Sequence, residues 1–487
     1  MVDSLRHNTI RALLWSFFEF IIKRCVQFVI GIVLARLLFP EQFGLIGILT
    51  VFIAVMQSFI DGGFGAALIQ KRDATQTDIC SIFYFNIAVG LVAALLLCAI
   101  APWIAEFYRQ PILTPMTRAL SLTIVLNSLG MIQSSILTKE INFKVQAKVS
   151  LIAGGLSGII GISLATMHFD VWSLVFQQVS AALFGNMCLW YYSRWRPALV
   201  FSFKALSGMF SFGSRMLFSR LLDQIFDNIY LLVIGKLFSV TDLAYFSRAK
   251  DFREIPSQTL SEAVGRVSFP VFSSIQDDKV RLKKAMKKAL AALVMVNFPM
   301  MLGLAAIARP LVLALLTPKW ADCIPYLQLL CLLRLLYPLH VINLNVLQAM
   351  GRSDLFLRLE VIKKVLIAVN IAINWRWGIF AMIYGMFALD YIGYYLNSYY
   401  TGALIGYSAR EQLRDSFPYL IMAMLMGIGV YVAGLQPFPN CWSILLAQVT
   451  MGIVIYVALC RMFRLPAFME MWEAGWEKVR LFKAGAS

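Results

Sequence analysis

The residues that could do chemistry in this sequence are charged side chains inside long apolar stretches. A charged side chain at the centre of a membrane span costs about 2.5–3.5 kcal/mol, so each one needs a compensating role. Arginine and lysine in such places suit an anionic ligand, because a guanidinium can hold a phosphate through two parallel hydrogen bonds. The candidate anion contacts are Lys23, Arg24, Arg215, Arg220 and Arg248.

Acidic side chains in the same stretches are candidates for binding a coupling proton or sodium ion. They are Glu19, Asp61, Asp223 and Asp227. Asp61 stands in the turn sequence Asp-Gly-Gly-Phe-Gly, so capping a helix or pairing with a basic residue at 71 or 72 is an alternative role for it.

Helical spacing offers a structural role for many of these charges. Oppositely charged residues three or four positions apart share one face of a helix and can neutralise each other. This spacing relates Glu19 to Lys23, Arg248 to Asp251, Lys250 to Glu254, and Glu262 to Arg266. For any one pair, holding helices together and binding a ligand therefore stay open as alternatives.

Membrane-spanning helices are the elements that must position these residues. Of the 487 residues 60% are hydrophobic and 14% charged, with a mean hydropathy of +0.75, whereas soluble domains are about 45–50% apolar and 25% charged. Lipid offers no water to backbone groups, so the spans should be helices. The sequence predicts fourteen spans, near residues 10–37, 41–69, 79–105, 112–137, 147–167, 171–193, 205–235, 241–275, 289–317, 321–350, 357–375, 378–403, 416–434 and 441–463.

The charges within these spans are unevenly distributed. Eleven basic and eight acidic residues fall in the spans, and fifteen of the nineteen belong to the first, second, seventh and eighth. Facing a shared aqueous cavity is the arrangement that keeps them out of lipid, and the basic surplus predicts that this cavity is cationic. Pro256 is expected to kink or break the eighth span.

Lysine and arginine also predict how the chain is oriented. The predicted cytoplasmic connections carry 27 of them and the outer ends carry five, so both termini are expected in the cytoplasm. This bias explains the net charge of +17 without a nucleic-acid partner. Eight scattered cysteines, three histidines and no Cys-x-x-Cys spacing predict no metal site. No cofactor is expected apart from a coupling proton or sodium ion.

Two short matches indicate an internal repeat. Residues 33–38 match residues 233–238, and Ile100-Ala101 with Pro111 matches Ile307-Ala308 with Pro318. Parallel repeats of this kind predict two six-helix lobes around a central cavity. The predicted domains are an N-terminal lobe (1–200), a C-terminal lobe (201–405), a terminal pair of spans (406–463) and a cytoplasmic tail (464–487). That tail is expected to be amphipathic and to lie along the membrane surface, with a disordered basic end as the alternative.

Several motifs resemble those of the polysaccharide transporter family. They are Leu37-Leu38-Phe39-Pro40-Glu41-Gln42-Phe43-Gly44-Leu45, Asp61-Gly62-Gly63-Phe64-Gly65, Ala67-Leu68-Ile69-Gln70-Lys71, Ile234-Gly235-Lys236, Tyr245-Phe246-Ser247-Arg248-Ala249-Lys250, Val267-Ser268-Phe269-Pro270 and Gly351-Arg352-Ser353-Asp354. The resemblance covers about residues 5–400 and points to the Wzx-type exporters of colanic and teichuronic acid. It implies the MOP superfamily fold, whose two lobes work by alternating access. In a related lipid II flippase, spans 1, 2, 7 and 8 line a cationic cavity.

The resemblance and the predicted cavity together imply a flippase. The expected substrate is an undecaprenyl-diphosphate-linked oligosaccharide repeat unit, moved to the outer leaflet of the bacterial inner membrane in polysaccharide biosynthesis by antiport with an ion. Besides this substrate and membrane lipids, a polysaccharide polymerase and export machinery are candidate partners. A drug exporter of the same superfamily is the alternative. A membrane glycosyltransferase or polymerase is disfavoured because the short outer links place no acid–base pair near a substrate, so no catalytic residue is expected.

Overall fold

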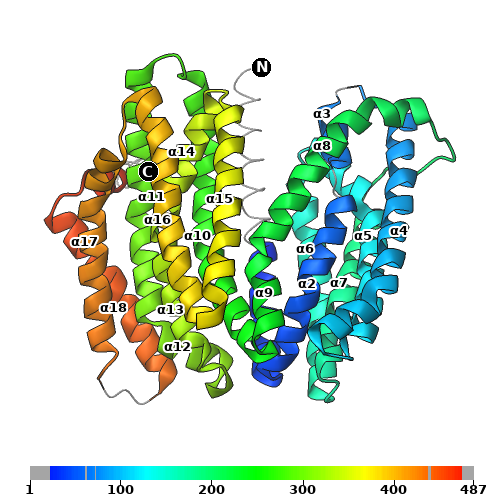
Figure 1. Ribbon diagram of the computed structural model, residues 1–487, viewed down its shortest axis with the longest axis horizontal. Coiled ribbons are helices and arrows are strands. Elements are labelled where there is room, and N and C mark those ends of the chain that lie inside the picture. Colours follow the sequence, from blue (N-terminus) through cyan, green and yellow to red (C-terminus); the bar gives the residue numbers. More distant parts are fainter. Residues whose placement is uncertain (1–21, 61–62, 72, 437–439, 474–487) are drawn as a thin grey trace, which may run out of the picture. The chain divides into compact units, whose positions relative to one another are not determined.

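The structure is a computed structural model that describes residues 22–60, 63–71, 73–436 and 440–473, and the regular structure in these ranges is helical throughout. The chain divides into two compact units, Met1–Ser247 and Arg248–Ser487. From residue 22 onward, each of the fourteen predicted spans coincides with one helix or with two consecutive helices (Figure 1). The prediction of an all-α membrane protein is confirmed, whereas the four domain boundaries stay a prediction.

The first unit is built around helix α2. Its elements are a helix at 22–37, α2 (Pro40–Ile60), α3 (Phe64–Gln70), α4 (Gln76–Tyr108), α5 (Leu113–Lys139), α6 (Phe143–Thr166), α7 (Val171–Tyr192), α8 (Phe203–Asp227) and α9 (Ile229–Leu237). Helix α2 packs against α4, α5, α7, α8 and α9. Helices α4 with α5 and α6 with α7 form tight antiparallel pairs joined by short links.

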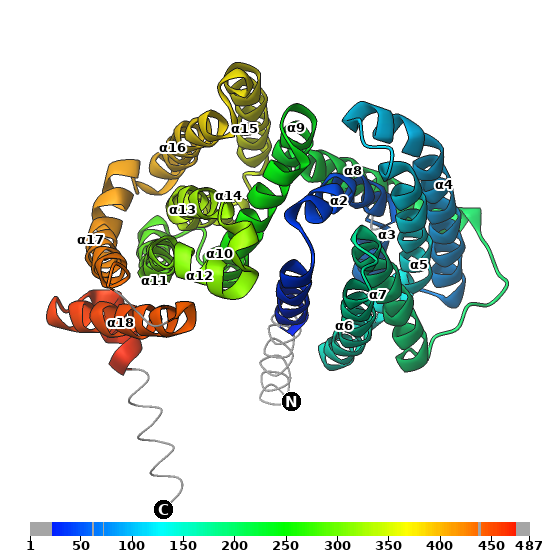
Figure 2. The ribbon, with the colours of Figure 1, turned by 90° about the horizontal axis from the view of Figure 1, so that it is seen from below.

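The second unit is built around helix α11. Helix α10 (Val240–Ser274) leads into it, followed by α11 (Lys279–Ala306), α12 (Ala308–Leu316), α13 (Cys323–Leu333), α14 (Tyr337–Ala349), α15 (Ser353–Asn374), α16 (Ile379–Ile405), α17 (Ala409–Ala433), α18 (Cys441–Met462) and a short helix at 466–473. Helix α11 packs against α13, α14, α16, α17 and α18, and Figure 2 shows α11 and α13 side by side.

Nine helical stretches in the described ranges are long and apolar enough to cross a membrane. They include α2, α4, α5 and α6 in the first unit, and α11, the α13–α14 stretch, α16, α17 and α18 in the second. Helices α8 and α10 do not qualify by this test. Both carry several of the charged residues that the sequence places inside spans, and charge lowers hydropathy.

The internal repeat reappears in where helices end. The helix at 22–37 stops at residue 37 and α2 begins at Pro40, while α9 stops at Leu237 and α10 begins at Val240. These equivalent breaks follow the matched segments 33–38 and 233–238. At the end of α2, Gly63 has a φ of 86°, a left-handed conformation that favours glycine and lets the chain turn into α3.

Pro256 does not break the eighth span, and a kink there stays a prediction. Helix α10 continues from Val240 to Ser274 as one helix, with both Pro256 and Pro270 inside it. The preceding predicted span is divided instead, because α8 ends at Asp227 and α9 begins at Ile229. A proline removes one backbone donor but leaves the flanking turns free to hydrogen-bond, so a helix can continue past it.

A charged cluster joins the N-terminal parts of α11 and α17. Lys283 and Lys287 donate hydrogen bonds to the Glu411 carboxylate at 2.8 and 2.6 Å, and Lys287 lies 3.1 Å from Asp415. These two lysines, Lys283 first, lower the pKa of Glu411. The cluster therefore links the two helices most strongly when the carboxylate is ionised.

Candidate functional site

Lys23 and Arg220, two of the predicted cations, line one cavity of the first unit. The cavity has a volume of about 460 Å³ and is walled by the helix at 22–37 and by α3, α5, α7 and α8. Both basic side chains are exposed, so their charged ends are accessible to a ligand. Residues far apart in the sequence are thus brought to one site.

Polar side chains cover much of the remaining wall. Asn127, Ser134 and Ser135 come from α5, and Asn186 comes from α7. The Asn186 Oδ1 atom is buried and accepts no hydrogen bond from the described residues. Because an unsatisfied buried acceptor costs about 1–3 kcal/mol, this wall favours a ligand that donates hydrogen bonds.

A second hollow of about 270 Å³ shares Lys23 and Ser134 with the first cavity. It adds the polar residues Gln27, Gln146, Ser150, Ser157 and Gln177. Gln146 is held in place because its Nε2 donates to Thr138 Oγ1 at 2.9 Å. We call the two connected cavities the polar hollow; it combines two cations with amides and hydroxyls.

A family model described as "Polysaccharide biosynthesis protein" matches residues 33–325. The chain belongs to this family. The succinoglycan biosynthesis transport protein ExoT of Rhizobium meliloti is 29% identical over 480 residues, which cover 95% of this chain and 94% of ExoT. The teichuronic acid biosynthesis protein TuaB of Bacillus subtilis is 30% identical over 302 residues, covering 61% of this chain and 62% of TuaB. The lipopolysaccharide biosynthesis protein WzxC of Escherichia coli is 25% identical, covering 87% and 89%.

Solved structures show that the fold is that of the MOP superfamily. The lipid II flippase MurJ in an inward closed conformation aligns with a TM-score of 0.76 at 15% identity, covering 93% of this chain and 98% of MurJ. An inward-facing multidrug resistance MATE family transporter aligns with a TM-score of 0.65 at 15% identity, covering 78% and 95%. This polysaccharide biosynthesis protein is therefore a multi-span membrane protein related to transporters, as the sequence predicted.

Of the other predicted anion contacts, Arg24 and Arg248 lie outside the polar hollow, and the side chain of Arg215 is not among those described. Arg24 is half-buried on the helix at 22–37 but does not line either cavity. Arg215 lies on α8, and its side chain is outside the described part of the chain. Arg248 belongs to the second unit, where its Nη1 lies 3.7 Å from the Asp251 carboxylate and its guanidinium 5.6 Å from the centre of the Trp320 ring. Arg248 thus takes part in structural contacts.

Two of the four predicted ion-coupling residues are described, and neither lines this site. Asp223 and Asp227 are exposed on α8 and do not line the polar hollow. Glu19 and Asp61 fall outside the described residues. Their roles in coupling stay predictions.

The helical charge pairs expected on α10 are confirmed where they are described. The Arg248–Asp251 pair is accompanied by Lys250 with Glu254, whose Nζ and Oε1 atoms are 3.9 Å apart. The side chains of Glu262 and Arg266 lie outside the described part. Both pairs lie within one helix, and their role in holding helices together or in binding a ligand stays a prediction.

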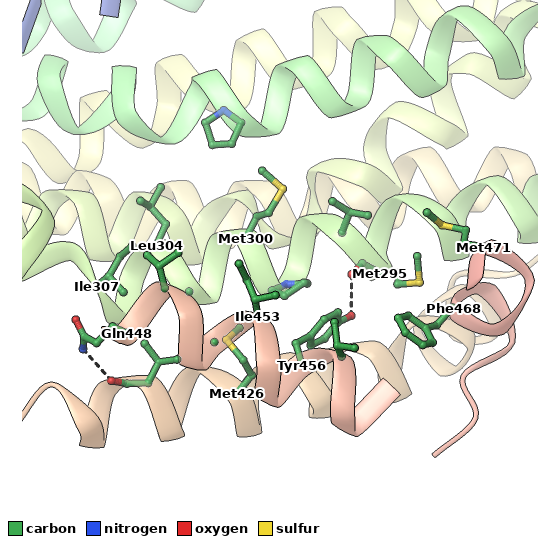
Figure 3. A pocket seen from close by; sticks show the side chains of 18 of the residues that line it. Met295, Met300, Leu304, Ile307, Met426, Gln448, Ile453, Tyr456, Phe468 and Met471 are labelled. Atoms are coloured by element: carbon green, nitrogen blue, oxygen red, sulfur yellow. Dashed lines mark hydrogen bonds between the residues drawn. The ribbon is translucent and has the colours of Figure 1, made fainter. Parts of the chain in front are cut away.

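The second unit carries an apolar groove that the sequence did not reveal (Figure 3). It has a volume of about 650 Å³ and lies between α11, α17, α18 and the helix at 466–473. The Tyr456 hydroxyl donates to the Met295 carbonyl at 2.7 Å and Gln448 Nε2 donates to the Val430 carbonyl at 2.8 Å, whereas Gln448 Oε1 is buried without a hydrogen-bond partner among the described residues; most of the other lining side chains are apolar. The groove therefore presents methyl, thioether and ring surfaces.

The predicted amphipathic tail forms one wall of this groove in its described part. Phe468, Met471 and Trp472 of the helix at 466–473 line the groove, whereas Glu470 on the same helix pairs with Lys288 at 2.5 Å. The sequence feature that is typical of such a groove is its set of methionines at 295, 300, 426 and 471, since flexible thioethers suit adaptable apolar sites. Their spacing across the chain gives no hint that they converge.

Proposed function

We propose that this protein is a flippase that moves an undecaprenyl-diphosphate-linked oligosaccharide from the cytoplasmic to the outer leaflet of the bacterial inner membrane. The observation that carries this proposal is the polar hollow, in which Lys23 and Arg220 stand beside amide and hydroxyl side chains. A diphosphate attached to a glycan offers the complementary groups, an anion next to many hydroxyls. The family and its relatives in polysaccharide biosynthesis support the same substrate class.

In this proposal the two cations hold the diphosphate. The Arg220 guanidinium donates two parallel hydrogen bonds to phosphate oxygens, and the Lys23 ammonium adds a point charge from the helix at 22–37. The sugar hydroxyls bind the amides of Asn127, Asn186 and Gln146. Arg24, Arg215 and Arg248 stay secondary candidates for contacts at other stages of transport.

The apolar groove of the second unit suits the lipid part of such a substrate. It lies among α11, α17 and α18, all of which are apolar enough to contact lipid. A polyprenyl tail consists of methyl and methylene groups that would pack against Met300, Met426 and Ile453. The groove would thus give such a tail an apolar environment.

Transport is proposed to work by alternating access coupled to a proton or sodium gradient, with both termini in the cytoplasm. Binding of the coupling ion changes the relative stability of inward-open and outward-open states, which lets an ion gradient drive a substrate. A polysaccharide polymerase and export machinery are the proposed partners on the outer side. The basic connections that predict the orientation support this arrangement.

A flipping assay in reconstituted vesicles tests the proposal. Vesicles carry a fluorescent lipid-diphosphate oligosaccharide, and a membrane-impermeant glycosidase reports which leaflet holds it. Replacing Arg220 or Lys23 by alanine removes a charge-assisted hydrogen bond worth about 1.5–3 kcal/mol, so substrate affinity should fall about 10- to 150-fold. Lys204→Ala is the matched control, because Lys204 is exposed on α8 and does not line the hollow.

The outcomes separate the possible functions. Transport by wild type and by Lys204→Ala, with loss in the Arg220→Ala and Lys23→Ala variants, supports the flippase and its site. Transport that survives both alanine substitutions refutes the cationic site. Failure of wild-type protein to move the lipid, together with efflux of an organic cation, would favour the drug-exporter alternative.

A further inference from the structure

A histidine of the second unit lies between two polar side chains of a neighbouring spanning helix. His340 is on α14, and both Asp390 and Asn397 are on α16, which packs against α14. The His340 Nε2 atom is 3.1 Å from Asp390 Oδ1, and Nδ1 is 2.9 Å from the Asn397 amide nitrogen. Asn397 is fully buried, whereas 13% of the His340 side chain and 27% of the Asp390 side chain remain accessible.

The cluster lies near the middle of its spans. His340 precedes the end of α14 at Ala349 by nine residues, and Asp390 follows the start of α16 at Ile379 by eleven. At 1.5 Å per residue these offsets are roughly 13 and 16 Å, in a hydrocarbon core about 30 Å thick. Ionisable residues at such depth are costly and mark proton or ion pathways more often than packing.

The hydrogen bonds of the imidazole suit two protonation states. In the arrangement described, the Asn397 amide donates to Nδ1, so the proton of the neutral ring is on Nε2, which lies 3.1 Å from Asp390 Oδ1 without making a hydrogen bond of regular geometry. Asn397 Oδ1 is buried and has no hydrogen-bond partner in the described ranges. If the amide turns over, this oxygen accepts a hydrogen bond from Nδ1–H of the imidazolium. The amide can therefore meet the ring nitrogen in either protonation state, although one of its two polar atoms has no partner among the described residues in each case.

Charged groups of the neighbouring elements influence the pair. Lys363 of α15 approaches it across Gly393, but its ammonium is held by Glu360 at 2.6 Å. Arg334 lies within electrostatic reach of Asp390, and Arg253 and Glu254 of α10 lie near Arg334. The Tyr394 ring packs edge-on to His340, and its hydroxyl donates to the Ala409 carbonyl. With Glu360 engaged, Asp390 is the carboxylate in direct contact with the imidazole.

The geometry points to the His340–Asp390 pair as the binding site of a coupling proton, and this inference rests on the proposed flippase function. Water at one side supplies H⁺ to the neutral imidazole, which becomes an imidazolium paired with the Asp390 carboxylate. Release to water on the other side regenerates the neutral ring. Histidine is the side chain that changes charge between pH 5 and 8. A sodium ion fits the site poorly, because hard cations prefer several oxygen ligands and one carboxylate stands here.

The position on two helices explains how one proton could affect conformation. Protonation adds one positive charge at the contact between α14 and α16, where it attracts Asp390 more strongly in a low-dielectric setting. A conformation that keeps the pair together is then favoured over one that separates it. Neither residue belongs to the polar hollow, so the proton and the substrate would act on different sites.

The first experiment measures proton binding without any substrate. The chain has three histidines, so protein labelled with ¹⁵N-histidine in lipid nanodiscs gives three imidazole signals. His340→Gln identifies its signal, which should change from neutral to protonated between pH 8 and pH 5. Asp390→Asn should reduce the protonated fraction of His340 at pH 6 several-fold. His168→Gln is the control, because His168 is exposed between α6 and α7. A His340 signal that stays neutral down to pH 5 overturns the inference.

The second experiment tests coupling and separates it from the flippase proposal. Wild-type vesicles should exchange lipid-linked oligosaccharide without a gradient, and a one-unit pH gradient should drive up to about tenfold accumulation for one proton per substrate. His340→Gln should keep the exchange but lose the accumulation, while His168→Gln keeps both. Absence of exchange in wild type would refute the proposed function itself. Accumulation that persists in His340→Gln, or that follows a sodium gradient instead, would refute the proton site alone.

Discussion

Asn343 of α14 and Gln412 of α17 exchange two hydrogen bonds in the core of the second unit, and breaking this exchange should destabilise the protein measurably. Asn343 Nδ2 donates to Gln412 Oε1 at 2.8 Å, and Gln412 Nε2 donates back to Asn343 Oδ1 at 3.0 Å. The same Nε2 reaches the Tyr407 carbonyl at 3.1 Å. Both amide side chains are fully buried.

The loss of stability expected for Gln412→Leu follows from the atoms that lose a hydrogen-bond partner. The Asn343 and Tyr407 oxygens each lose the hydrogen bond that Gln412 donates, while Asn343 Nδ2 keeps its bond to the Leu339 carbonyl at 2.7 Å. Each stranded buried acceptor costs about 1–3 kcal/mol. The extra apolar contact of leucine offsets about 1 kcal/mol of this. The free energy of unfolding should therefore fall by about 1–5 kcal/mol.

A double-mutant cycle checks the reasoning. Equilibrium unfolding in detergent is compared for wild type, Gln412→Leu, Asn343→Leu and the double variant. Because replacing both partners leaves fewer unsatisfied groups than replacing one, the double variant should be more stable than the sum of the singles predicts, by about 1–3 kcal/mol. Additive losses, or a Gln412→Leu protein as stable as wild type, would show that the exchange contributes nothing.

Three further changes have expected outcomes. Glu411→Gln should lower the free energy of unfolding by up to about 1 kcal/mol near pH 7. Because the folded-state pKa of Glu411 is lowered, this contribution is present above about pH 4.5 and disappears as the pH falls further. Unfolding curves of the variant and the wild type should therefore converge in acid. Gly90→Ala should destabilise the protein by about 1–3 kcal/mol in a thermal unfolding assay, since a Cβ there would lie 2.6 Å from Ser128 Cβ. Gly155→Ala is the control: a Cβ there would meet open space, so this variant should be neutral or stabilising in the same assay. Arg248→Ala should lower thermal stability but leave diphosphate-lipid affinity within about twofold in a binding titration, because its contacts are with Asp251 and Trp320.

Much of the fold follows from hydropathy and spacing. The fourteen predicted spans match helices because an apolar run longer than about 20 residues has one structure available in lipid. The pairs on α10 were predictable because residues three or four positions apart meet within one helix whatever the tertiary structure is. The continuous course of α10 through Pro256 could not be predicted in this way, because whether a proline breaks a helix depends on the surroundings of that helix.

The histidine cluster and the groove show where such reasoning stops. His340 and Asp390 are 50 positions apart on different helices, and no local rule relates them. One signal did exist: Asp390 and Asn397 are seven positions apart and therefore share a face of α16. Two polar residues on one face of an apolar helix imply a polar partner opposite. Finding that partner requires knowing which helix packs there, and sequence periodicity does not say.

A charge within a span is a good site candidate when it lines a cavity of polar side chains. Arg248 and Lys250 have carboxylates three or four residues away on α10 itself. Their charges are therefore neutralised locally, and no ligand is needed to supply a counter-charge. Lys23 and Arg220 face a cavity walled by five helices, and the polar groups around them are amides and hydroxyls. An amide or hydroxyl can hydrogen-bond a cation but cannot cancel its charge. The polar hollow thus places two cations among amides and hydroxyls, where an anionic head group would add a complementary charge, whereas Arg248 and Lys250 pair with carboxylates of their own helix.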